Sequence, residues 1–366
     1  MNIGEFMSRN LLSRAINKGY RAYDRLCGMV DNRSVEVLME EEVEKHLKPN
    51  TKTVLYVAAC YDYAKKNQGL SYEHYHFYHT LRKMDYSLIY FAYDRIKQRF
   101  GNEKMSKILR EIVYTYQPDI LFYGHYHDWI NHEVLKEISN ELPTKTIIWL
   151  TDDRVDYEYE RPVWELFNVV VTTDKTCYER RKAEGFNTFL SQWACNPYIY
   201  QKLNTPKIYD VSFVGTCYGE RKTFVETLRN EGINVATFGI GWERSNRIPQ
   251  SDLVKIFNQS KIVLDISFTS KDGSVLTIKG RDFEVPGCES LLVTKHTKEI
   301  AEFFMSNEEI VTYQDVNDAA EKIKYYLTHD YERERIAHRG YERVLRDHTW
   351  EKRLSDIFEY ACRVEK

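Results

Sequence analysis

Two segments in the second half of the chain have the residues of an anion-binding turn. Gly215-Thr216-Cys217-Tyr218-Gly219-Glu220-Arg221 lies between an apolar run and a helix-forming segment. Its glycines let the backbone approach an anion, a helix start offers N–H donors, and Arg221 adds positive charge. In Lys279-Gly280-Arg281-Asp282-Phe283-Glu284, a base is followed three residues later by an acid. Arg281 could therefore hold a pyrophosphate and Glu284 a ribose diol, although a surface ion pair worth about 0.2–0.5 kcal/mol has the same spacing.

A third segment extends this group of candidate binding residues. Gly239-Ile240-Gly241-Trp242 closes the next apolar run. The indole of Trp242 could stack on a nucleobase, or it could pack in the core. The residues that we expect to bind a nucleotide-containing ligand are Gly215, Thr216, Arg221, Gly239, Trp242, Lys279, Arg281 and Glu284.

The first half of the chain offers carboxylates and histidines. Asp152 and Asp153 follow an apolar run, and adjacent carboxylates raise one another's pKa, which suits a general base near neutral pH. The alternative is an N-cap or a structural pair. A tyrosine-rich stretch contains His74, His76 and His79, which could line a pocket or bind a metal, or could form a helical surface cluster.

The elements that must position these residues alternate between strands and helices. Within residues 51–200, short apolar runs suit buried parallel strands at Val54–Ala58, Tyr86–Phe91, Ile120–Tyr123, Thr146–Leu150 and Val169–Val171. Helical patterns separate them at Lys104–Tyr116, His132–Leu142 and Lys175–Gly185. This alternation predicts a parallel sheet with helices on both faces.

The alternation restarts in residues 201–345. Strands are predicted at Tyr209–Gly215, Val235–Gly239, Ile262–Ile266 and Leu291–Thr294, and helices at Arg221–Glu231, Val316–Leu327 and Tyr331–Val344. A last helix, Trp350–Arg363, lies in residues 346–366 and is expected to pack back toward the first domain. We predict an α/β chain of two Rossmann-like domains that face a central cleft, with ligands at the carboxyl ends of the strands.

Residues 1–50 differ from the rest and predict an N-terminal helical extension. Apolar residues recur at helical spacing between Leu12 and Leu26, with basic residues among them. A second helical run, Ser34 to Leu47, is acidic and stops at Lys48-Pro49-Asn50. The first helix could pack on the rest of the protein or lie on an anionic membrane surface.

The composition is that of a globular protein without bulk charge. The 366 residues carry 52 Lys and Arg against 55 Asp and Glu, a net charge of −3, which argues against a chain that coats nucleic acid. No stretch approaches ~18 uninterrupted apolar residues, and the start lacks a signal-peptide core. Seven scattered cysteines are typical of reduced thiols. We expect a cytoplasmic protein, with contact to the inner face of the membrane as the alternative.

Two common nucleotide-binding motifs are absent. No glycine follows the run Val54–Ala58 until Gly69, so the G-x-G-x-x-G fingerprint of nicotinamide and flavin enzymes is missing. The G-x-x-x-x-G-K-[ST] loop of P-loop NTPases is missing too. We expect no organic cofactor and no metal site.

Several motifs between Gly280 and Arg353 occur together in one known family. They are Arg281-Asp282-Phe283-Glu284, Glu299-Ile300-Ala301-Glu302-Phe303-Phe304, Gly340-Tyr341-Glu342-Arg343-Val344 and His348-Thr349-Trp350. With them, the segment resembles the C-terminal domain of group 1 (family 4) glycosyltransferases, and within these the spore-maturation-protein (CgeB-like) type. Asp210–Gly215 with Glu220-Arg221 extends the resemblance upstream, so that it covers most of residues 207–358.

This resemblance implies the GT-B fold and a nucleotide-sugar donor, with a UDP-sugar expected, bound mostly by the second domain. Carried over residue by residue, Glu284 binds the ribose, while Arg281 and Arg221 hold the diphosphate. Thr151-Asp152-Asp153-Arg154 resembles a segment of phage DNA β-glucosyltransferases whose aspartate is the inverting base, which points to Asp152. In retaining family-4 enzymes a histidine of this region contacts the donor sugar, so His125 is the rival candidate, with a structural histidine as the alternative.

Two positions depart from the family pattern. Leu276 stands where many family-4 enzymes have a glutamate, eight residues before the ribose ligand, and this bears on sugar recognition and on retaining chemistry. Glu289 stands where a glycine is usual, and this bears on the mouth of the preceding helix.

The expected function is metal-independent transfer of a sugar from a nucleotide donor to a hydroxyl of a glycan, protein or lipid-linked acceptor. Three other interpretations stay open: a DNA-modifying glucosyltransferase, a metal-assisted transferase that uses Asp152, Asp153 and Asp156, and a non-catalytic protein that binds nucleotide sugars or glycans. Dependence on Mn²⁺ would identify the metal-assisted enzyme, and hydrolysis of the donor would argue against the non-catalytic protein.

Overall fold

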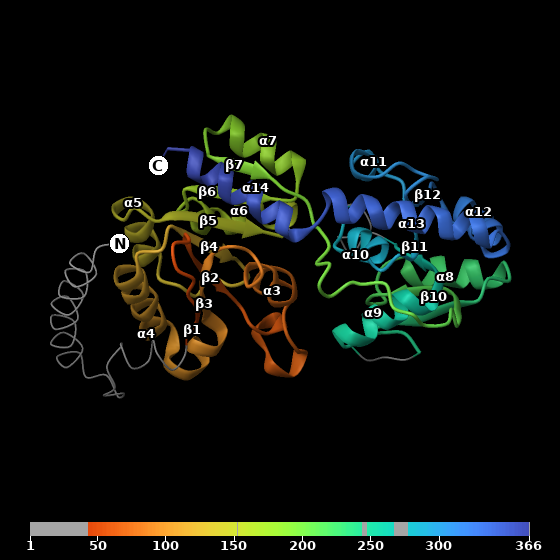
Figure 1. The fold of residues 1–366 in the computed structure, drawn as a ribbon, viewed down its shortest axis with the longest axis horizontal. Coiled ribbons are helices and arrows are strands. Elements are labelled where there is room, and N and C mark those ends of the chain that lie inside the picture. The colour runs from red at the N-terminus through yellow and green to blue at the C-terminus, as the bar shows by residue number, and fades with distance from the viewer. Residues whose placement is uncertain (1–42, 152, 244–246, 267–276, 366) are drawn as a thin grey trace. The chain divides into compact units, whose positions relative to one another are not determined.

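The computed structural model describes residues 43–151, 153–243, 247–266 and 277–365, and they fold into two compact units. Unit 1 contains the described residues up to Leu190 together with those from Ile357 onward, and unit 2 contains those from Ser191 to Asp356. Each unit is built around its own sheet (Figure 1). The prediction of two parallel-sheet α/β domains is confirmed.

Unit 1 has a seven-stranded sheet in the order β1-β3-β2-β4-β5-β6-β7. All neighbouring strands are parallel except β1 and β3. The strands are β1 (Glu44–His46), β2 (Thr53–Ala58), β3 (Ser87–Ala92), β4 (Ile120–Gly124), β5 (Lys145–Leu150), β6 (Val169–Thr172) and β7 (Thr188–Leu190). The helical elements are η1 (Asp62–Ala64), η2 (Lys66–Gln68), η3 (His74–Tyr78), α3 (His79–Leu81), α4 (Tyr93–Tyr116), α5 (His132–Glu141), α6 (Asp153–Trp164) and α7 (Lys175–Ala183).

The edge strand β1 corrects part of the N-terminal prediction. The sequence predicted helix as far as Leu47, but Glu44 to His46 pair antiparallel with Tyr90 to Leu88 of β3. Backbone pairing with β3 and the burial of Val43 outweigh the helix preference of the glutamates, because tertiary contacts decide the conformation of so short a segment. The remainder of the predicted extension, residues 1–42, lies outside the described residues.

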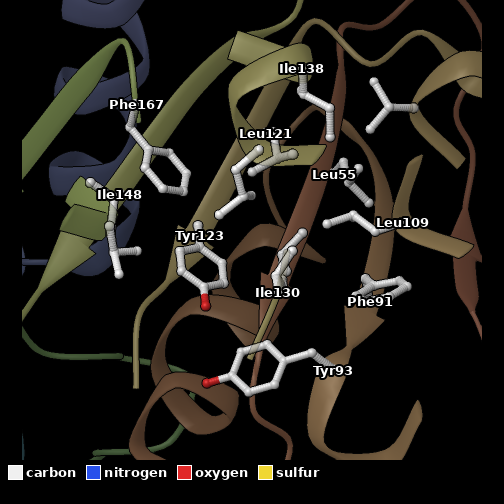
Figure 2. Packing of buried hydrophobic residues seen from close by; sticks show 14 of the residues in the cluster. Leu55, Phe91, Tyr93, Leu109, Leu121, Tyr123, Ile130, Ile138, Ile148 and Phe167 are labelled. Carbon is white, nitrogen blue, oxygen red and sulfur yellow. The ribbon is translucent and has the colours of Figure 1, made fainter. Parts of the chain in front are cut away.

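Both faces of the unit 1 sheet are buried, as its long apolar runs require. One face packs on α4, α5, α6 and α7 through side chains such as Leu55, Leu121, Tyr123, Ile138 and Phe167 (Figure 2). The other face is aromatic. Phe77 of η3 contacts Phe122 and Trp149, with ring centroids 5.3 and 5.2 Å apart, and Phe358 from the end of the chain contacts Phe122 at 5.6 Å.

Unit 2 has a five-stranded parallel sheet in the order β12-β11-β10-β8-β9. The strands are β8 (Tyr209–Val214), β9 (Val235–Phe238), β10 (Ser260–Leu264), β11 (Leu291–Lys295) and β12 (Val311–Tyr313). The helices are α8 (Arg221–Asn230), α9 (Gln250–Gln259), α10 (Arg281–Gly287), α11 (Ile300–Phe303), α12 (Val316–Thr328), α13 (Asp330–Asp347) and α14 (Trp350–Arg363). Helix α14 starts in unit 2 and ends in unit 1.

The core of unit 2 joins alternate strand residues to α8, α12 and α13. Val211, Phe213, Ile262, Leu264 and Val293 are buried in it. Among the helices that the structure describes, none is both long enough and apolar enough to cross a membrane.

Candidate functional site

The strand order of unit 2 reverses between β8 and β10. From β8 the chain continues to β9 on one side, whereas β10 lies on the other side of β8. The loops after β8 and β10 therefore diverge, and this switch point at the carboxyl ends of the strands is where open α/β sheets bind ligands. The turn Gly215–Glu220 follows β8, and Asp265 and Ile266 follow β10.

Arg221 ties these two loops together. Its Nε and Nη2 donate to the carbonyl of Ile266 at 3.1 and 3.0 Å, and its Nη1 donates to the carbonyl of Thr216 at 3.0 Å. The side chain is buried, and burial together with the charge of Arg281 lowers its pKa. The sequence assigned Arg221 to a diphosphate, but the guanidinium instead holds the two loops of the switch point in place.

Gly239 and Trp242 contact the backbone of this turn at Gly215. Gly239 has φ of +120°, and a Cβ atom there would lie 2.5 Å from the carbonyl oxygen of Gly215, so only glycine fits. The indole Nε1 of Trp242 donates to the same oxygen at 2.8 Å. Trp242 is 7% exposed and packs edge-on against Phe213. The structure therefore favours core packing for Trp242 over stacking on a nucleobase.

The turn after β8 keeps donors available. The amides of Gly215 and Cys217 bond to the carbonyls of Phe238 and Ile240 at 2.9 and 2.8 Å. The amide of Thr216, in contrast, donates to none of the described residues. Helix α8 begins directly after this turn, and no side chain caps its start. Its first amides are therefore uncapped at the same end of the sheet. This is a turn that an anion can approach.

Arg281 is the charged side chain that the fold brings to this turn. Its Nη1 pairs with Oδ1 of the buried Asp265, and a Cβ atom on Gly215 would lie 3.4 Å from its Nη2. The side chain keeps 21% of its surface exposed. Burial alone lowers the pKa of Arg281, but the carboxylates of Asp265 and Glu284 outweigh this and raise it, so the guanidinium stays positive.

Asp282 fixes the start of α10, and sequence reasoning gave it no role of its own. Its Oδ2 accepts from the amide of Lys279 at 3.0 Å, and its Oδ1 accepts from the hydroxyl of Thr294 at 2.9 Å. Burial and the neighbouring Asp265 raise the pKa of Asp282. These bonds hold Lys279, which is partly exposed, next to Arg281.

Glu284 lies within α10, and Glu289 follows the end of this helix. Glu284 is 6% exposed, so the group expected to bind a ribose is nearly covered by the protein. Glu289 has φ of +53°, in the left-handed region that favours glycine. Lys202 Nζ and His338 Nδ1 bind its carboxylate at 2.9 and 3.1 Å, which explains how a glutamate is held where the family has a glycine. Leu276 lies outside the described residues.

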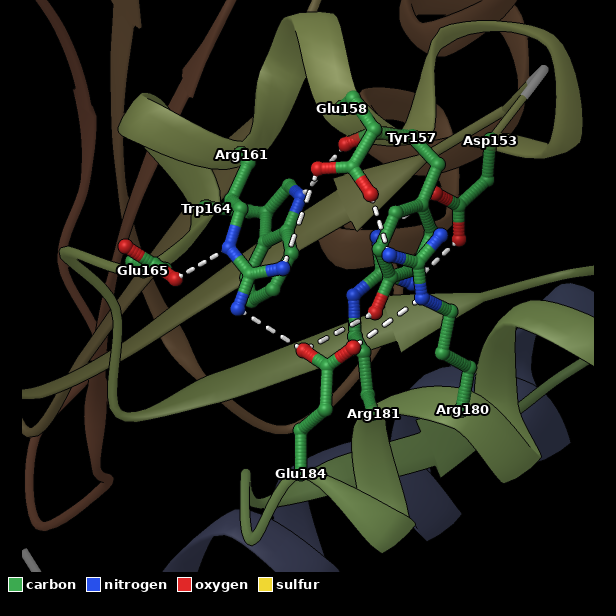
Figure 3. A network of polar contacts seen from close by, with 9 residues as sticks. All are labelled: Asp153, Tyr157, Glu158, Arg161, Trp164, Glu165, Arg180, Arg181 and Glu184. Atoms are coloured by element: carbon green, nitrogen blue, oxygen red, sulfur yellow. Dashed lines mark hydrogen bonds and ion pairs between the residues drawn. The ribbon is translucent and has the colours of Figure 1, made fainter.

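In unit 1, the structure describes one member of the predicted carboxylate pair, Asp153, and it is enclosed. Asp152 lies outside the described residues. Asp153 is 1% exposed, and both of its oxygens accept from Arg181 of α7, with Nη2 to Oδ1 at 2.6 Å. The rings of Tyr157 and Trp164 cover the Arg181 guanidinium (Figure 3). Asp153 therefore has no exposed oxygen for a substrate proton and links α6 to α7 instead.

His125 follows β4 directly and is 7% exposed. Its Nε2 lies 3.5 Å from Glu160, and its buried Nδ1 has no hydrogen-bond partner among the described residues. Burial lowers the pKa of His125 to about 4, with Asp128 acting weakly in the opposite direction. The imidazole is thus neutral at physiological pH.

The histidines of the tyrosine-rich stretch stack with aromatic rings. His74 stacks on Tyr78 at 4.6 Å, and Tyr72 stacks on His76 at 3.8 Å. In the ranges that the structure describes, no three His, Cys, Asp or Glu side chains gather as metal ligands would.

Two carboxylates near sheet edges escaped sequence reasoning. Asp265 was read as part of a strand, although β10 ends at Leu264. Glu73 lies in the tyrosine-rich stretch, where only the histidines drew attention, and the fold carries it to the carboxyl end of the unit 1 sheet. Ending the predicted strand at Leu264 would have identified Asp265 as a residue at the carboxyl end of the sheet. No local sequence signal identifies Glu73.

Comparisons with known proteins agree with this geometry. Residues 221–359 match the model of the glycosyl transferase-like family. The spore protein CgeB of Bacillus subtilis (strain 168) is 21% identical over 270 residues, which cover 66% of this chain and 82% of that protein.

Solved structures give the same fold. An α-glucosyltransferase in complex with UDP-glucose and DNA containing an abasic site has a TM-score of 0.57 at 10% identity, covering 86% of this chain and 100% of that chain. Anabaena Alr3699/HepE in complex with UDP and glucose has a TM-score of 0.56 at 9% identity, with the same coverage of both chains. The predicted GT-B fold and the predicted resemblance to the CgeB-like type are confirmed.

Proposed function

We propose that this chain, which has the GT-B fold and a glycosyl transferase-like domain at residues 221–359, transfers a sugar from a UDP-sugar to an acceptor hydroxyl. Unit 2 binds the donor at its switch point. Arg281, Lys279 and the turn amides that make no bond within the described residues, such as that of Thr216, hold the diphosphate, and Glu284 binds the ribose. Arg221, Gly239 and Trp242 keep the turn in shape.

The observation that carries this proposal is the position of Arg281. It is a permanently charged, partly exposed side chain beside a glycine turn, at the switch point of a parallel sheet. Asp265 fixes one edge of the guanidinium and leaves the other edge beside Gly215. A preorganised charge of this kind stabilises the negative charge that develops on a leaving diphosphate.

The proposed transfer needs no metal ion, because Arg281, Lys279 and the turn amides supply the charge. A chelator such as EDTA should therefore leave turnover unchanged, whereas the metal-assisted alternative predicts the loss of turnover.

The acceptor that we propose is a hydroxyl of a glycan, protein or lipid-linked saccharide. DNA is the second candidate, because one similar structure is an α-glucosyltransferase solved with DNA. The six described cysteines form no disulfide, which supports a cytoplasmic location.

Arg281→Ala tests the donor site. We expect kcat/KM for the hydrolysis of UDP-glucose, with water as acceptor, to fall roughly 10²–10³-fold, because the leaving diphosphate loses its stabilising charge. UDP should also bind more weakly by calorimetry. Because the variant removes the ion pair with Asp265, Arg281→Lys, which retains a positive charge, is measured beside it, and thermal unfolding confirms that both variants fold.

The control is Lys222→Gln, which removes an exposed positive charge from α8 in the same unit and should change neither binding nor turnover. Wild-type turnover in Arg281→Ala would remove Arg281 from the site. A thermal-shift screen with UDP-, GDP-, dTDP- and CMP-sugars identifies the nucleotide.

A further inference from the structure

The sheet of unit 1 has a switch point of its own. The chain runs from β2 to β3 on one side, and β4 lies on the other side of β2. The loops after β2 and β4 therefore diverge at the carboxyl ends of these strands, which makes this edge the expected ligand site of unit 1. Of the residues that sequence reasoning proposed as catalytic, the structure describes Asp153 and His125, and neither offers an exposed carboxylate there.

Glu73 is a carboxylate that lies at this edge of the sheet. The chain that leaves β2 returns to the sheet edge at Ser71, whose amide and hydroxyl donate to the carbonyls of Cys60 and Ala59 at 2.9 and 2.8 Å. The phenol of Tyr56 donates to the carbonyl of Glu73 at 3.3 Å. These bonds fix the backbone that carries the carboxylate over the ends of β2 and β4.

Gly124, the last residue of β4, makes room for the Glu73 side chain. A Cβ atom on Gly124 would lie 3.6 Å from Cγ of Glu73 and 3.2 Å from Cβ of Ala58. The end of β4 thus approaches Glu73 without a side chain between them. Glu73 is intermediate in exposure, neither fully buried nor fully exposed.

The electrostatic surroundings of Glu73 are those of a carboxylate that can take up a proton near neutral pH. Burial raises the pKa of Glu73 to about 7; the negative charge of Asp62 adds to this, while bonds from its own amide and from Ser71 act against it. The other titratable groups that face it are the phenols of Tyr56 and Tyr93. No cation in the described ranges forms an ion pair with Glu73.

We infer that Glu73 is the general base of the reaction, accepting the proton of an acceptor hydroxyl bound at the switch point of unit 1. This inference rests on the proposed function. In the step, the O–H bond of the acceptor breaks and its proton passes to Glu73, while the acceptor oxygen forms a bond to C1 of the sugar. The bond between C1 and the diphosphate oxygen breaks, and its electron pair leaves with the nucleoside diphosphate.

The two described candidates from the sequence suit this role less well. Both oxygens of Asp153 bind Arg181, and the ion pair is fully buried. His125 is nearly covered, and its lowered pKa makes it a weak base. Glu73 instead lies at the carboxyl end of the sheet beside Gly124, is partly exposed as a residue, and forms no ion pair with a described cation.

Hydrolysis of UDP-glucose with water as acceptor, measured from pH 5 to 9, tests the inference. We expect kcat/KM of the wild type to rise with pH and to level off above about 7, because only the ionised carboxylate accepts a proton. Glu73→Gln should lower kcat at least 10²-fold and abolish this rise, while Glu73→Asp should retain part of the rate. UDP affinity, measured by calorimetry, should stay unchanged in both variants.

The matched control is Glu141→Gln, which alters an exposed glutamate at the end of α5 in the same unit and should leave the pH profile as in the wild type. A merely structural role for Glu73 would lower the rate with the folded fraction and would keep the rise with pH. Hydrolysis by Glu73→Gln within threefold of the wild type overturns the inference but leaves the proposed function standing. Failure of the wild type both to bind UDP and to hydrolyse UDP-glucose overturns both.

Discussion

Asp153 and Glu73, both in unit 1, lie in opposite electrostatic settings. Asp153 has its charge neutralised by Arg181, and neither side chain is exposed. Burial, together with the neighbouring carboxylate of Asp62, raises the pKa of Glu73, so its proton is held more tightly. A carboxylate that is ionised and enclosed stabilises structure, whereas one that can exchange a proton with a ligand can take part in chemistry.

Asp153→Asn should destabilise unit 1 by about 3–5 kcal/mol, because the guanidinium of Arg181 stays buried without its counter-charge. The free energy of unfolding from denaturant titration measures this loss. Glu158→Gln is the control, since Glu158 pairs with Arg180 in the same network but is 63% exposed (Figure 3); we expect a change within about 0.5 kcal/mol. A catalytic Asp153 would instead give a stable protein that has lost its turnover.

At the scale of elements, the switch point of unit 2 depends on one bridge between two loops. Arg221 comes from the start of α8, yet its contacts are the carbonyls that follow β8 and β10. Three hydrogen bonds from one planar group fix both loops in a single arrangement, which a flexible ammonium group cannot reproduce. The shape of the candidate donor site is thus set by a residue that need not contact the donor.

Arg221→Lys separates charge from geometry. The lysine retains the positive charge but loses the forked contact with Ile266 and Thr216, so we expect UDP affinity to fall about tenfold or more, equivalent to about 1.4 kcal/mol. Calorimetry measures the affinity, and Lys222→Gln again serves as the control. Unchanged affinity in Arg221→Lys would show that charge alone matters at this position.

Nine of the twelve described strands, β2 to β6 and β8 to β11, could be predicted, because buried parallel strands are short apolar runs between turn signals. The three-residue strands β7 and β12 were not predicted. Val54–Ala58 and Leu291–Thr294 agree with β2 and β11 to within one residue at each end. Helix α6 was not predicted, since its charged residues and Pro162 hide the apolar stripe. Strand β1 was predicted as helix, because pairing with β3 is a tertiary effect that local sequence does not carry.

The candidate site was predictable only in part, and for a related reason. Residue types placed Gly215, Lys279 and Arg281 correctly at one sheet edge, because that edge follows from strand direction alone. The direction in which a side chain points does not follow from the strand direction. Arg221 and Trp242 turn toward backbone carbonyls, and Glu73 reaches its sheet edge through a loop of more than ten residues.

At the scale of the whole molecule, the last helix belongs to both units. Helix α14 starts in unit 2, and its residues from Ile357 onward belong to unit 1, where Phe358 is buried. The ring of Phe358 packs edge-on against Tyr86 and Phe122, with centroids 5.5 and 5.6 Å away. Farther on, Lys145 Nζ donates to the carbonyl of Val364 at 2.6 Å. The end of the chain therefore completes the aromatic face of the first sheet.

Phe358→Ala and Leu228→Ala should consequently destabilise different units, because Phe358 packs on the first sheet and Leu228 of α8 lies in the core of unit 2. Each removes a fully buried side chain, at about 3–5 and 2–5 kcal/mol respectively. In hydrogen exchange followed by mass spectrometry, Phe358→Ala should lower the protection of β2 and β4 and leave that of β8 and β10 unchanged, and Leu228→Ala should do the reverse. Equal loss of protection in both sheets from either variant would mean that the units unfold as one, because independent cores confine the loss of a buried contact to the sheet it covers.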